Sequence, residues 1–400
     1  MNNLPQNSSL PVLALNSGSS SLKFGLYLVN DSIVETLVSG SVEALETVSS
    51  EFLAKDGQGK VILRETAPLA AQDVAVERIA RYLVESQAPM PRAIGHRIVH
   101  GGTALRHHCC IDRAVMQKLE AATAFAPVHT PAALSVIRGA ILHFPGVTHV
   151  ACFDTCFHAQ MPEVAWVLPI PASLRSLGLR RYGFHGLSCE SIVEQLGASL
   201  PSRTVIAHLG NGASITAVKD GISIDTSMGL TPSGGVMMGT RSGDIDPGLL
   251  VYLVRERQFN ATMLEELVDH QGGMVGISGV SGDMRQLHEA AVTNADARLA
   301  IRMFCYSVRK QIAAMSAVLG GVDLIVFTGG IGENDPIVRA EICSGLSMLG
   351  LALDSSRNHP LVNPISGSKS RCAAQVLPSR EDDLIARHAW DLARSRRPSE

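Results

Sequence analysis

A short strand-loop-strand pattern occurs twice in this chain of 400 residues, and the repeat constrains the fold more than any other feature. In the first copy, the apolar run 12–15 leads into the polar loop 16–21, and alternating apolar residues follow. The second copy has the apolar run 205–209, the loop 210–214 and renewed alternation, at an offset of 193 residues. Two β-hairpins at nearly half the chain length predict a duplicated domain, each copy opening with a hairpin that faces a shared cleft.

Length and composition agree with two domains. Four hundred residues exceed what one hydrophobic core usually organises. With 46% hydrophobic and 18% charged residues, the chain has enough apolar material for large interiors, which excludes global disorder. The formal net charge of −3 comes without a basic block, which argues against nucleic-acid and polybasic membrane partners. A small-molecule partner is the expectation.

Neither a membrane span nor a signal peptide is expected. Every apolar run is shorter than the roughly 18 to 20 residues that cross a bilayer, and the N-terminus lacks a basic n-region. The eight cysteines form no C-x-x-C pair and no regular framework, so buried reduced thiols are expected rather than disulfides or zinc ligands. These features predict a cytoplasmic protein.

Helical periodicity fills much of the remaining chain. Apolar residues recur at a spacing near 3.6 in residues 73–87, 113–122, 132–143 and 186–197, and in the stretch from about 294 to 319. Strands that alternate with such helices predict an α/β fold with mixed sheets.

The two hairpin tips suggest phosphate binding. Small polar residues leave several backbone N–H groups and hydroxyls exposed, and these groups hydrogen-bond phosphate oxygens. For one tip alone, an ordinary Ser/Gly turn is the better interpretation. Because two such tips occur at matching positions, phosphate binding is favoured over an ordinary turn.

A third glycine-rich element follows an apolar run. Residues 322–328 predict a strand, residues 329–334 a glycine turn, and Pro336 the start of a helix. Asp335 stands where the last glycine of a dinucleotide fingerprint would be, and the phosphate-loop motif G-x-x-x-x-G-K-[ST] does not occur in the sequence. A Rossmann or P-loop protein is therefore disfavoured.

Polar segments around Arg97, Asp154 and His185 lie between the hairpins. Each alone is more often structural than catalytic. The stretch 226–248 is rich in glycine and carries Arg241, and a long ordered loop of this kind is usually functional. Arginine suits phosphate or carboxylate binding. Because a Ser-His-Asp spacing and a metal-ligand cluster are both missing from the sequence, this inventory favours phosphoryl transfer, in which positioning and charge neutralisation dominate.

Several long segments, in order along the chain from residue 12 to about 387, resemble the acetate kinase family, in the superfamily of acetate and sugar kinases and actin. They are NSGSSSLKF (16–24), GHRIVHGG (95–102), FDTCFH (153–158), RRYGFHG (180–186), HLGNGAS (208–214), DTSMGLTP through MMGTRSGDIDPG (225–248) and FTGGIGEN (327–334).

The resemblance implies an α/β fold of two duplicated ribonuclease H-like domains, with mixed sheets flanked by helices and a nucleotide cleft between the domains. Residues 1–150 would form the N-terminal domain, with a C-terminal helix at about 384–400 packing back on it. Residues 151–383 would form the C-terminal domain, with most of the nucleotide site. The implied reaction is reversible, Mg²⁺-dependent, direct in-line transfer of the ATP γ-phosphate to acetate, giving acetyl phosphate and ADP, by a homodimer.

Matching positions imply the site residues. Asp154, His185 and Arg241 would be catalytic, while Asn16 and Glu381 would hold Mg²⁺, with Mn²⁺ as a second candidate metal. The residues implied for substrate binding are Arg97, Lys23, Val99, Val128, Phe184 and Pro232. Those implied for ATP binding are Lys23, His208, Leu209, Gly210, Asn211, Gly212, Asp283, Met284, Arg285, Gly330, Ile331, Gly332, Glu333 and Asn334.

Physical chemistry supports these implied roles. A carboxylate with a pKa of ~4 to 5 is already ionised at neutral pH, so acetate needs no general base. The obstacle is repulsion between two anions, which arginines, a histidine and Mg²⁺ offset. The chain departs from the usual family pattern at Thr103, Cys156, Leu187, Cys189, Ser233, Gly234 and Arg380, none of which is assigned to the chemistry.

Three alternatives stay open. A propionate kinase or a broader short-chain acyl kinase is the nearest, because one methylene in an apolar pocket is worth only about 1 to 3 kcal/mol. A nucleotide-binding protein of the same fold without turnover is disfavoured by the arginines and His185. A sugar kinase would need a carboxylate base for a neutral hydroxyl, and Asp154 is the candidate.

Overall fold

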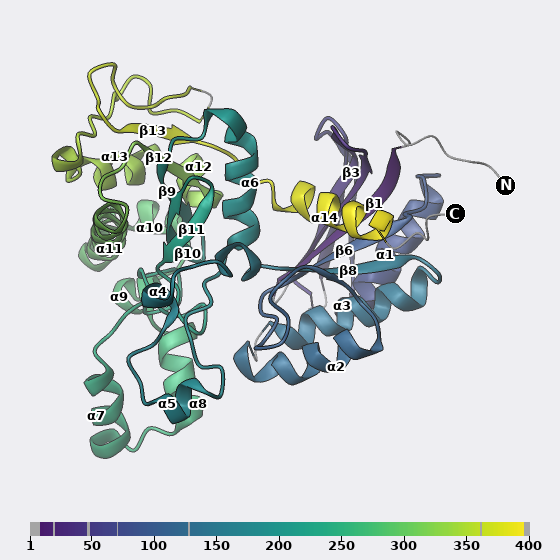
Figure 1. The fold of residues 1–400 in the computed structure, drawn as a ribbon, viewed down its shortest axis with the longest axis horizontal. Helices are drawn as coiled ribbons and strands as arrows, with labels where there is room; N and C mark the ends of the chain where they lie inside the picture. The colour runs from purple at the N-terminus through teal and green to yellow at the C-terminus, as the bar shows by residue number, and fades with distance from the viewer. Residues whose placement is uncertain are drawn as a thin grey trace. The chain divides into compact units, whose positions relative to one another are not determined.

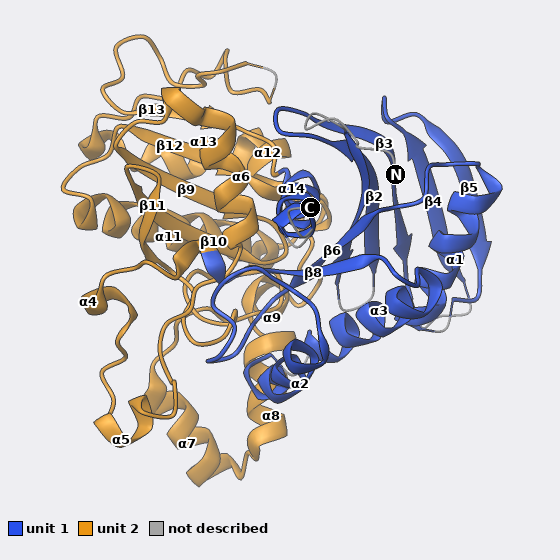
Figure 2. Ribbon diagram, turned by 45° about the vertical axis from the view of Figure 1, so that its right-hand side comes forward, with its two compact units in different colours: residues 1–156, 380–400 blue, residues 157–379 orange. Residues whose placement is uncertain are grey.

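The computed structural model shows two α/β units, each with its own mixed sheet (Figure 1). Unit 1 comprises residues 1–156 and 380–400, and unit 2 comprises residues 157–379 (Figure 2). The structure describes residues 9–18, 21–45, 49–69, 71–126, 129–360 and 362–395.

The sheet of unit 1 has the order β5-β4-β3-β2-β1-β6-β8-β7. Strands β1 to β5 pair antiparallel in sequence order, whereas β6 is parallel to β1 and β8 is parallel to β6. The strands are β1 (Leu10–Ser17), β2 (Leu22–Val29), β3 (Val34–Glu43), β4 (Ser50–Asp56), β5 (Val61–Ala67), β6 (Ala93–Ile98), β7 (Cys109–Cys110) and β8 (Thr148–Phe153).

Helices cover both faces of this sheet. On one face, Leu13 and Ile94 join a core with residues of α1 (Gln72–Glu85) and α3 (Thr130–His143). On the other face, α14 (Glu381–Ser395) lies so close that a Cβ on Gly95 would be 2.5 Å from a methyl of Ile385. The glycine therefore permits α14 to pack on β6. Helix α2 (Arg113–Ala121) and the short η1 (Ala122–Phe125) complete the unit.

The sheet of unit 2 has the order β11-β10-β9-β12-β13. Strands β9, β10 and β11 pair antiparallel in sequence order, β12 is parallel to β9, and β13 is parallel to β12. Order and directions match those of β3-β2-β1-β6-β8, so the predicted duplication is present in the fold. The strands are β9 (Arg203–Leu209), β10 (Ala213–Lys219), β11 (Ile222–Thr226), β12 (Leu324–Thr328) and β13 (Ala373–Val376).

Helices α6 (Gly186–Leu196) and α11 (Ala295–Val318) flank this second sheet (Figure 1). Cys189 and Ile192 of α6 pack on Ile206 and Val326 of the sheet. The other helices of the unit are η3 (Gly197–Ser199), α4 (Glu163–Trp166), α5 (Ala172–Arg175), α7 (Pro247–Arg257), α8 (Ala261–Glu265), η4 (Glu266–His270), α9 (Gly273–Ser278), α10 (Met284–Ala290), α12 (Gly329–Asn334), α13 (Pro336–Ser344) and η5 (Ser347–Leu349); η2 (Cys156–His158) lies where the units meet in the sequence.

The helices expected from periodicity are confirmed to within a few residues, as are both hairpins and the start of α13 at Pro336. One expectation is wrong: residues 329–334 form the helix α12 rather than a turn. Its start needs glycine, because Gly329 has φ +78° and a Cβ there would lie 2.8 Å from the Leu209 carbonyl oxygen. Within the described ranges, no helix is both long and apolar enough to span a membrane.

Candidate active site

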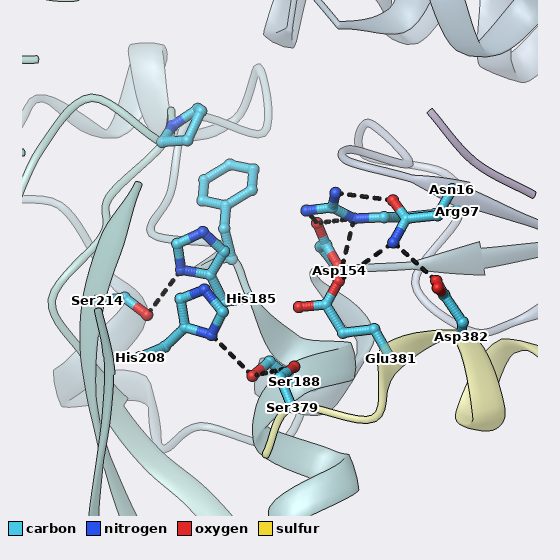
Figure 3. A network of polar contacts seen from close by, with 12 residues as sticks. Asn16, Arg97, Asp154, His185, Ser188, His208, Ser214, Ser379, Glu381 and Asp382 are labelled. Carbon is cyan, nitrogen blue, oxygen red and sulfur yellow. Dashed lines mark hydrogen bonds and ion pairs between the residues drawn. The ribbon is translucent and has the colours of Figure 1, made fainter. Parts of the chain in front are cut away.

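A polar cluster lies at one edge of the sheet in unit 1. Asn16 is near the end of β1, Arg97 is near the end of β6, and Asp154 directly follows β8. These three strands are parallel, so their carboxyl ends meet at the same edge. Glu381 begins α14 and joins the cluster (Figure 3). Four residues that the sequence assigned to substrate, metal or catalysis are thus brought together by one sheet and one helix.

Arg97 is the centre of this cluster. Its Nε and Nη2 donate to Oδ2 of Asp154 at 3.0 and 2.7 Å, and its Nη1 donates to Oδ1 of Asn16 at 3.0 Å. Its Nε also lies 4.0 Å from Oε2 of Glu381. Three partners from three elements therefore fix the guanidinium plane.

Asp382 is a member of the cluster that sequence reasoning missed. Nδ2 of Asn16 donates to Oδ1 of Asp382 at 2.9 Å and is 3.5 Å from Oε2 of Glu381. The amide of Asn16 thus presents its oxygen to Arg97 and its nitrogen to the carboxylates. The signal available in the sequence was the run of three carboxylates at residues 381–383. They lie in the first turn of α14, where negative charges interact favourably with the positive end of the helix dipole.

Burial and neighbouring charges act in opposite directions on the pKa values of Arg97 and Asp154. Burial lowers the pKa of Arg97, but Asp154 and Glu381 outweigh it, so the pKa is raised above its usual value and the guanidinium stays charged. Burial raises the pKa of Asp154 to about 6 despite Arg97, and Glu381 adds to the rise. The pKa of Asp382 is also raised, and burial is the largest cause.

The cluster contains oxygen atoms that could bind a cation. Among the described residues, Oδ1 of Asp154 is buried and has no hydrogen-bond partner. The carboxylates of Glu381 and Asp382 lie within the same network. Carboxylate and amide oxygens are the ligands that Mg²⁺ prefers. This donor set therefore fits the divalent cation that the sequence resemblance implied.

His185 lies in unit 2, at the residue that precedes α6. Its φ of +57° is in the left-handed region, which non-glycine residues seldom adopt. Its Nδ1 lies 3.0 Å from Oγ of Ser214, and its ring stacks on that of His208 with centroids 4.2 Å apart (Figure 3). Nδ1 of His208 in turn lies 2.8 Å from Oγ of Ser188. Both rings are thus held by hydroxyls and by each other.

The tip of the β9-β10 hairpin gathers the predicted residues of unit 2. A Cβ on Gly212 would lie 3.2 Å from Nε2 of His185 and 3.3 Å from Nη1 of Arg241. Nη1 of Arg241 also donates to the carbonyl oxygen of Pro232 at 3.3 Å. The glycine at this tip therefore leaves room for a histidine and an arginine to converge on exposed backbone. Phe184, next to His185, is buried.

A pocket of about 910 Å³ adjoins this hairpin tip within unit 2. The predicted nucleotide-site residues that line it are Gly210, Asn211, Asp283, Met284, Arg285, Gly330, Ile331 and Asn334. They come from the hairpin tip, the start of α10, and α12. Segments far apart in the sequence therefore form one cavity.

The pocket also has lining that the sequence did not reveal, namely Thr240, Gly282, His288, Asp335, Pro336 and Ile337. Asp335 caps α13 by accepting from the backbone N–H groups of Ile337 and Val338. Its other oxygen pairs with Nε2 of His288 at 2.7 Å, which joins α10 to α13. The D-P dipeptide, a helix-start signal, was the available clue.

The remaining predicted residues do not line this pocket. Leu209 is buried in β9. Glu333 accepts from the backbone N–H groups of Gly329 and Ser379, which is a structural arrangement. Gly212 and Gly332 lie next to lining residues in the sequence, and His208 lies two residues before Gly210.

Lys23, Val99 and Val128 lie in the sequence range of unit 1. Lys23 is exposed on β2, opposite Asn16 in the sheet register. Val99 follows β6 and is half-buried. Val128 lies outside the described residues.

Two sheets with one order and one set of directions define the fold class of the protein, two duplicated ribonuclease H-like α/β units. Within that class, a family model described as the acetokinase family matches residues 11–387. The chain belongs to the acetokinase family.

Curated relatives and solved structures agree with this placement. An acetate kinase of Deinococcus radiodurans is 42% identical over 389 residues, covering 94% of this chain and 96% of that protein. A crystal structure of Porphyromonas gingivalis acetate kinase superposes with a TM-score of 0.85 at 35% identity, covering 96% of this chain and 99% of the other. A propionate kinase from Francisella tularensis superposes with a TM-score of 0.89 at 36% identity, covering 96% and 100%.

Proposed function

We propose that this chain transfers the γ-phosphate of ATP to acetate, reversibly and with Mg²⁺, giving acetyl phosphate and ADP. The observation that carries the proposal is the network joining Arg97 to Asp154, Asn16 and Glu381, in a chain of the acetokinase family. In this proposal Arg97 binds the acyl substrate, and unit 2 binds the nucleotide.

The charge state of the cluster suits an anionic acceptor. Acetate is ionised at neutral pH and attacks without a general base. The permanently charged Arg97 offsets its negative charge and, being fixed by three partners, holds an oriented carboxylate. Asp154 limits the freedom of Arg97.

The pocket of unit 2 suits a nucleotide. Apolar side chains of Met284, Ile331 and Ile337 offer faces for a base, while backbone of Gly210 and Gly330 offers unobstructed approach for phosphates. His185 and Arg241 converge on Gly212 at the hairpin tip, where they would donate to the oxygens of the migrating phosphoryl group.

Mg²⁺ would be held by Asp154, Glu381 and Asp382, with Asn16 oriented beside them. When bound, the ion would neutralise phosphate charge and orient the phosphate oxygens. Asn16 spans this cluster, because its amide nitrogen donates to Asp382 while its oxygen accepts from Arg97. Asn16 thereby holds the arginine that would bind the substrate beside the carboxylates that would bind Mg²⁺.

The test is formation of acetohydroxamate when the protein is incubated with ATP, Mg²⁺, hydroxylamine and acetate. Propionate and butyrate are run beside acetate. If no acid supports product above background, the assignment fails. If propionate is preferred, the chain is a propionate kinase, an alternative favoured by the superposition on the propionate kinase of Francisella tularensis.

The proposal includes further expectations from the resemblance. Val99, Phe184, Pro232 and Val128 would form the acyl wall, and Lys23 would contact substrate and nucleotide. The two units, residues 1–156 with 380–400 and residues 157–379, would act as the two functional domains of a cytoplasmic homodimer. Sedimentation of the purified protein as a monomer would refute the dimer.

A further inference from the structure

His158 is a buried side chain for which the proposed reaction has no use. It ends η2, four residues after Asp154, and its side chain is fully enclosed in unit 2. Its Nε2 lies 2.9 Å from the carbonyl oxygen of Phe184, and its Nδ1 lies 2.8 Å from Oγ of Ser223.

These two contacts fix the tautomer of His158. A carbonyl oxygen only accepts, so Nε2 carries the proton and donates to Phe184. In the neutral ring Nδ1 then accepts from the hydroxyl of Ser223. Burial lowers the pKa of His158 to about 4, in keeping with a ring that stays neutral at pH 7. His158 is therefore a fixed donor aimed at one backbone carbonyl.

That carbonyl belongs to the peptide that joins Phe184 to His185. His185 has φ +57°, a left-handed conformation that a non-glycine residue keeps only when its surroundings enforce it. Gly183, one residue before Phe184, has φ +75°, and a Cβ there would lie 2.8 Å from two ring carbons of His158. The ring of His158 thus packs on one end of the unusual turn and hydrogen-bonds its middle.

We propose that His158 is a positioning residue for His185, acting through the Phe184 carbonyl rather than by touching substrate. The inference rests on the proposed function of His185 in phosphoryl transfer. The hydrogen bond from Nε2 sets the Phe184-His185 peptide, which places the imidazole of His185 against Ser214 and beside Gly212. Without this bond the turn relaxes and the imidazole leaves the hairpin tip.

Two near-isosteric substitutions separate this role from simple packing. The side-chain amide of Gln reaches the position of Nε2, so His158→Gln keeps a donor for Phe184. The shorter amide of Asn reaches only the position of Nδ1, so His158→Asn keeps a partner for Ser223 but loses the donor. We expect kcat to fall about 10- to 100-fold in His158→Asn, since small misplacements have such effects. We expect kcat within about threefold of the parent in His158→Gln, with the KM for ATP unchanged in both.

Ser223→Ala is the matched control, because it removes the contact at Nδ1 and leaves the donor at Nε2. It should melt at a lower temperature and keep its kcat. Equal kcat in His158→Asn and His158→Gln, or a loss that follows melting temperature across all three variants, overturns the proposal. If His158→Asn does not fold, Gly183→Ala replaces it, because its Cβ would press on the same ring and on the methyl of Thr226; wild-type kcat there also overturns the proposal.

A spectroscopic readout separates this proposal from the proposed function. The ring ¹H and ¹⁵N shifts of His185 should move in His158→Asn and stay in place in His158→Gln. If the parent protein phosphorylates none of the three acids but the shifts move as stated, the proposed function fails while the positioning role stands. If the parent is active and the His185 shifts are the same in both variants, the positioning role fails alone.

Discussion

The guanidinium of Arg97 donates two hydrogen bonds to a single oxygen of Asp154, Oδ2, at 3.0 and 2.7 Å. The second oxygen, Oδ1, is buried and has no hydrogen-bond partner among the described residues. One oxygen of this carboxylate therefore orients the arginine, and in the proposed reaction the other would bind Mg²⁺. This arrangement is the physical basis for assigning both substrate and metal binding to one cluster.

Replacing Asp154 by Asn tests that division. The substitution keeps the shape but removes the charge that orients Arg97 and that would bind Mg²⁺. We expect kcat to fall about 100- to 1000-fold and the Mg²⁺ concentration for half-maximal activity to rise, both measured by hydroxamate formation. Asp323→Asn is a control, since its pair with Arg203 is half-exposed and should matter little. Wild-type Mg²⁺ dependence in Asp154→Asn would contradict a metal role for this residue.

The pKa of Asp154 predicts an acid limb in the activity profile. Burial raises this pKa to about 6 in the metal-free site, so below about pH 6 protons compete with Mg²⁺ for the carboxylate, and activity at subsaturating Mg²⁺ should fall with pH. Glu381 contributes to the rise through its negative charge. Glu381→Gln should therefore move the limb to lower pH, although the overall rate is reduced. A limb that stays at the same pH in this variant would assign the titration to another group.

The pH dependence of stability should have another origin. His96 and His149 lie buried in unit 1, with Nε2 of one 3.0 Å from Nδ1 of the other. Burial lowers the pKa of His149 from 6.5 to about 4, and that of His96 well below 6.5. Between about pH 4 and 6.5 the unfolded chain binds protons that the folded chain excludes, so stability rises with pH over this window. His149 alone contributes about 3 kcal/mol to the change in the free energy of unfolding over this pH window.

His149→Asn isolates this contribution. The Asn oxygen reaches the position of Nδ1, so the partner of His96 is kept and one titrating group is removed. We expect the melting temperature to rise less steeply between pH 4.5 and 6.5 than in the parent. His270, which is exposed, provides the control, and His270→Asn should leave the slope unchanged. An unaltered slope in His149→Asn would show that other groups control acid unfolding.

Local sequence patterns predicted the framework of the fold because they are set by near neighbours. The spacing of apolar residues gave α11 and both hairpins, and the 193-residue offset gave the duplication that the sheet topology confirms. The membership of the polar clusters came from family resemblance, not from periodicity. The structure brings those residues together, and their roles stay predictions.

Long-range contacts were beyond sequence reasoning. Asp382 reaches Asn16 across 366 positions, and no local spacing signals such a pair. The joining of His288 to Asp335 and of His158 to Phe184 depends on the packing of helices and turns that are distant along the chain. Residues 329–334 were expected as a turn because glycine disfavours helices, but the carboxylate of Glu333 accepts from the Gly329 N–H and supports that short helix.

Gly212 offers a test of convergence at the hairpin tip. A Cβ there would lie 3.2 Å from His185 and 3.3 Å from Arg241, which is tighter than ordinary contact. Gly212→Ala should therefore displace one of these side chains and lower kcat about 10- to 100-fold, with little change in melting temperature. At Gly229, a Cβ meets no atom within 4 Å, so Gly229→Ala should keep its kcat. Equal activity in the two variants would contradict a catalytic role for this tip.

The pair between His288 and Asp335 tests whether the pocket of unit 2 is the nucleotide site. Asp335→Ala removes both the cap of α13 and the link to α10, so the wall should loosen. We expect the KM for ATP to rise about tenfold, as for loss of a charge-assisted hydrogen bond, while the KM for acetate stays constant. Asp354→Ala is a control, because Asp354 accepts from Ser356 in an exposed turn. A change in the acetate KM with constant ATP affinity would place the nucleotide elsewhere.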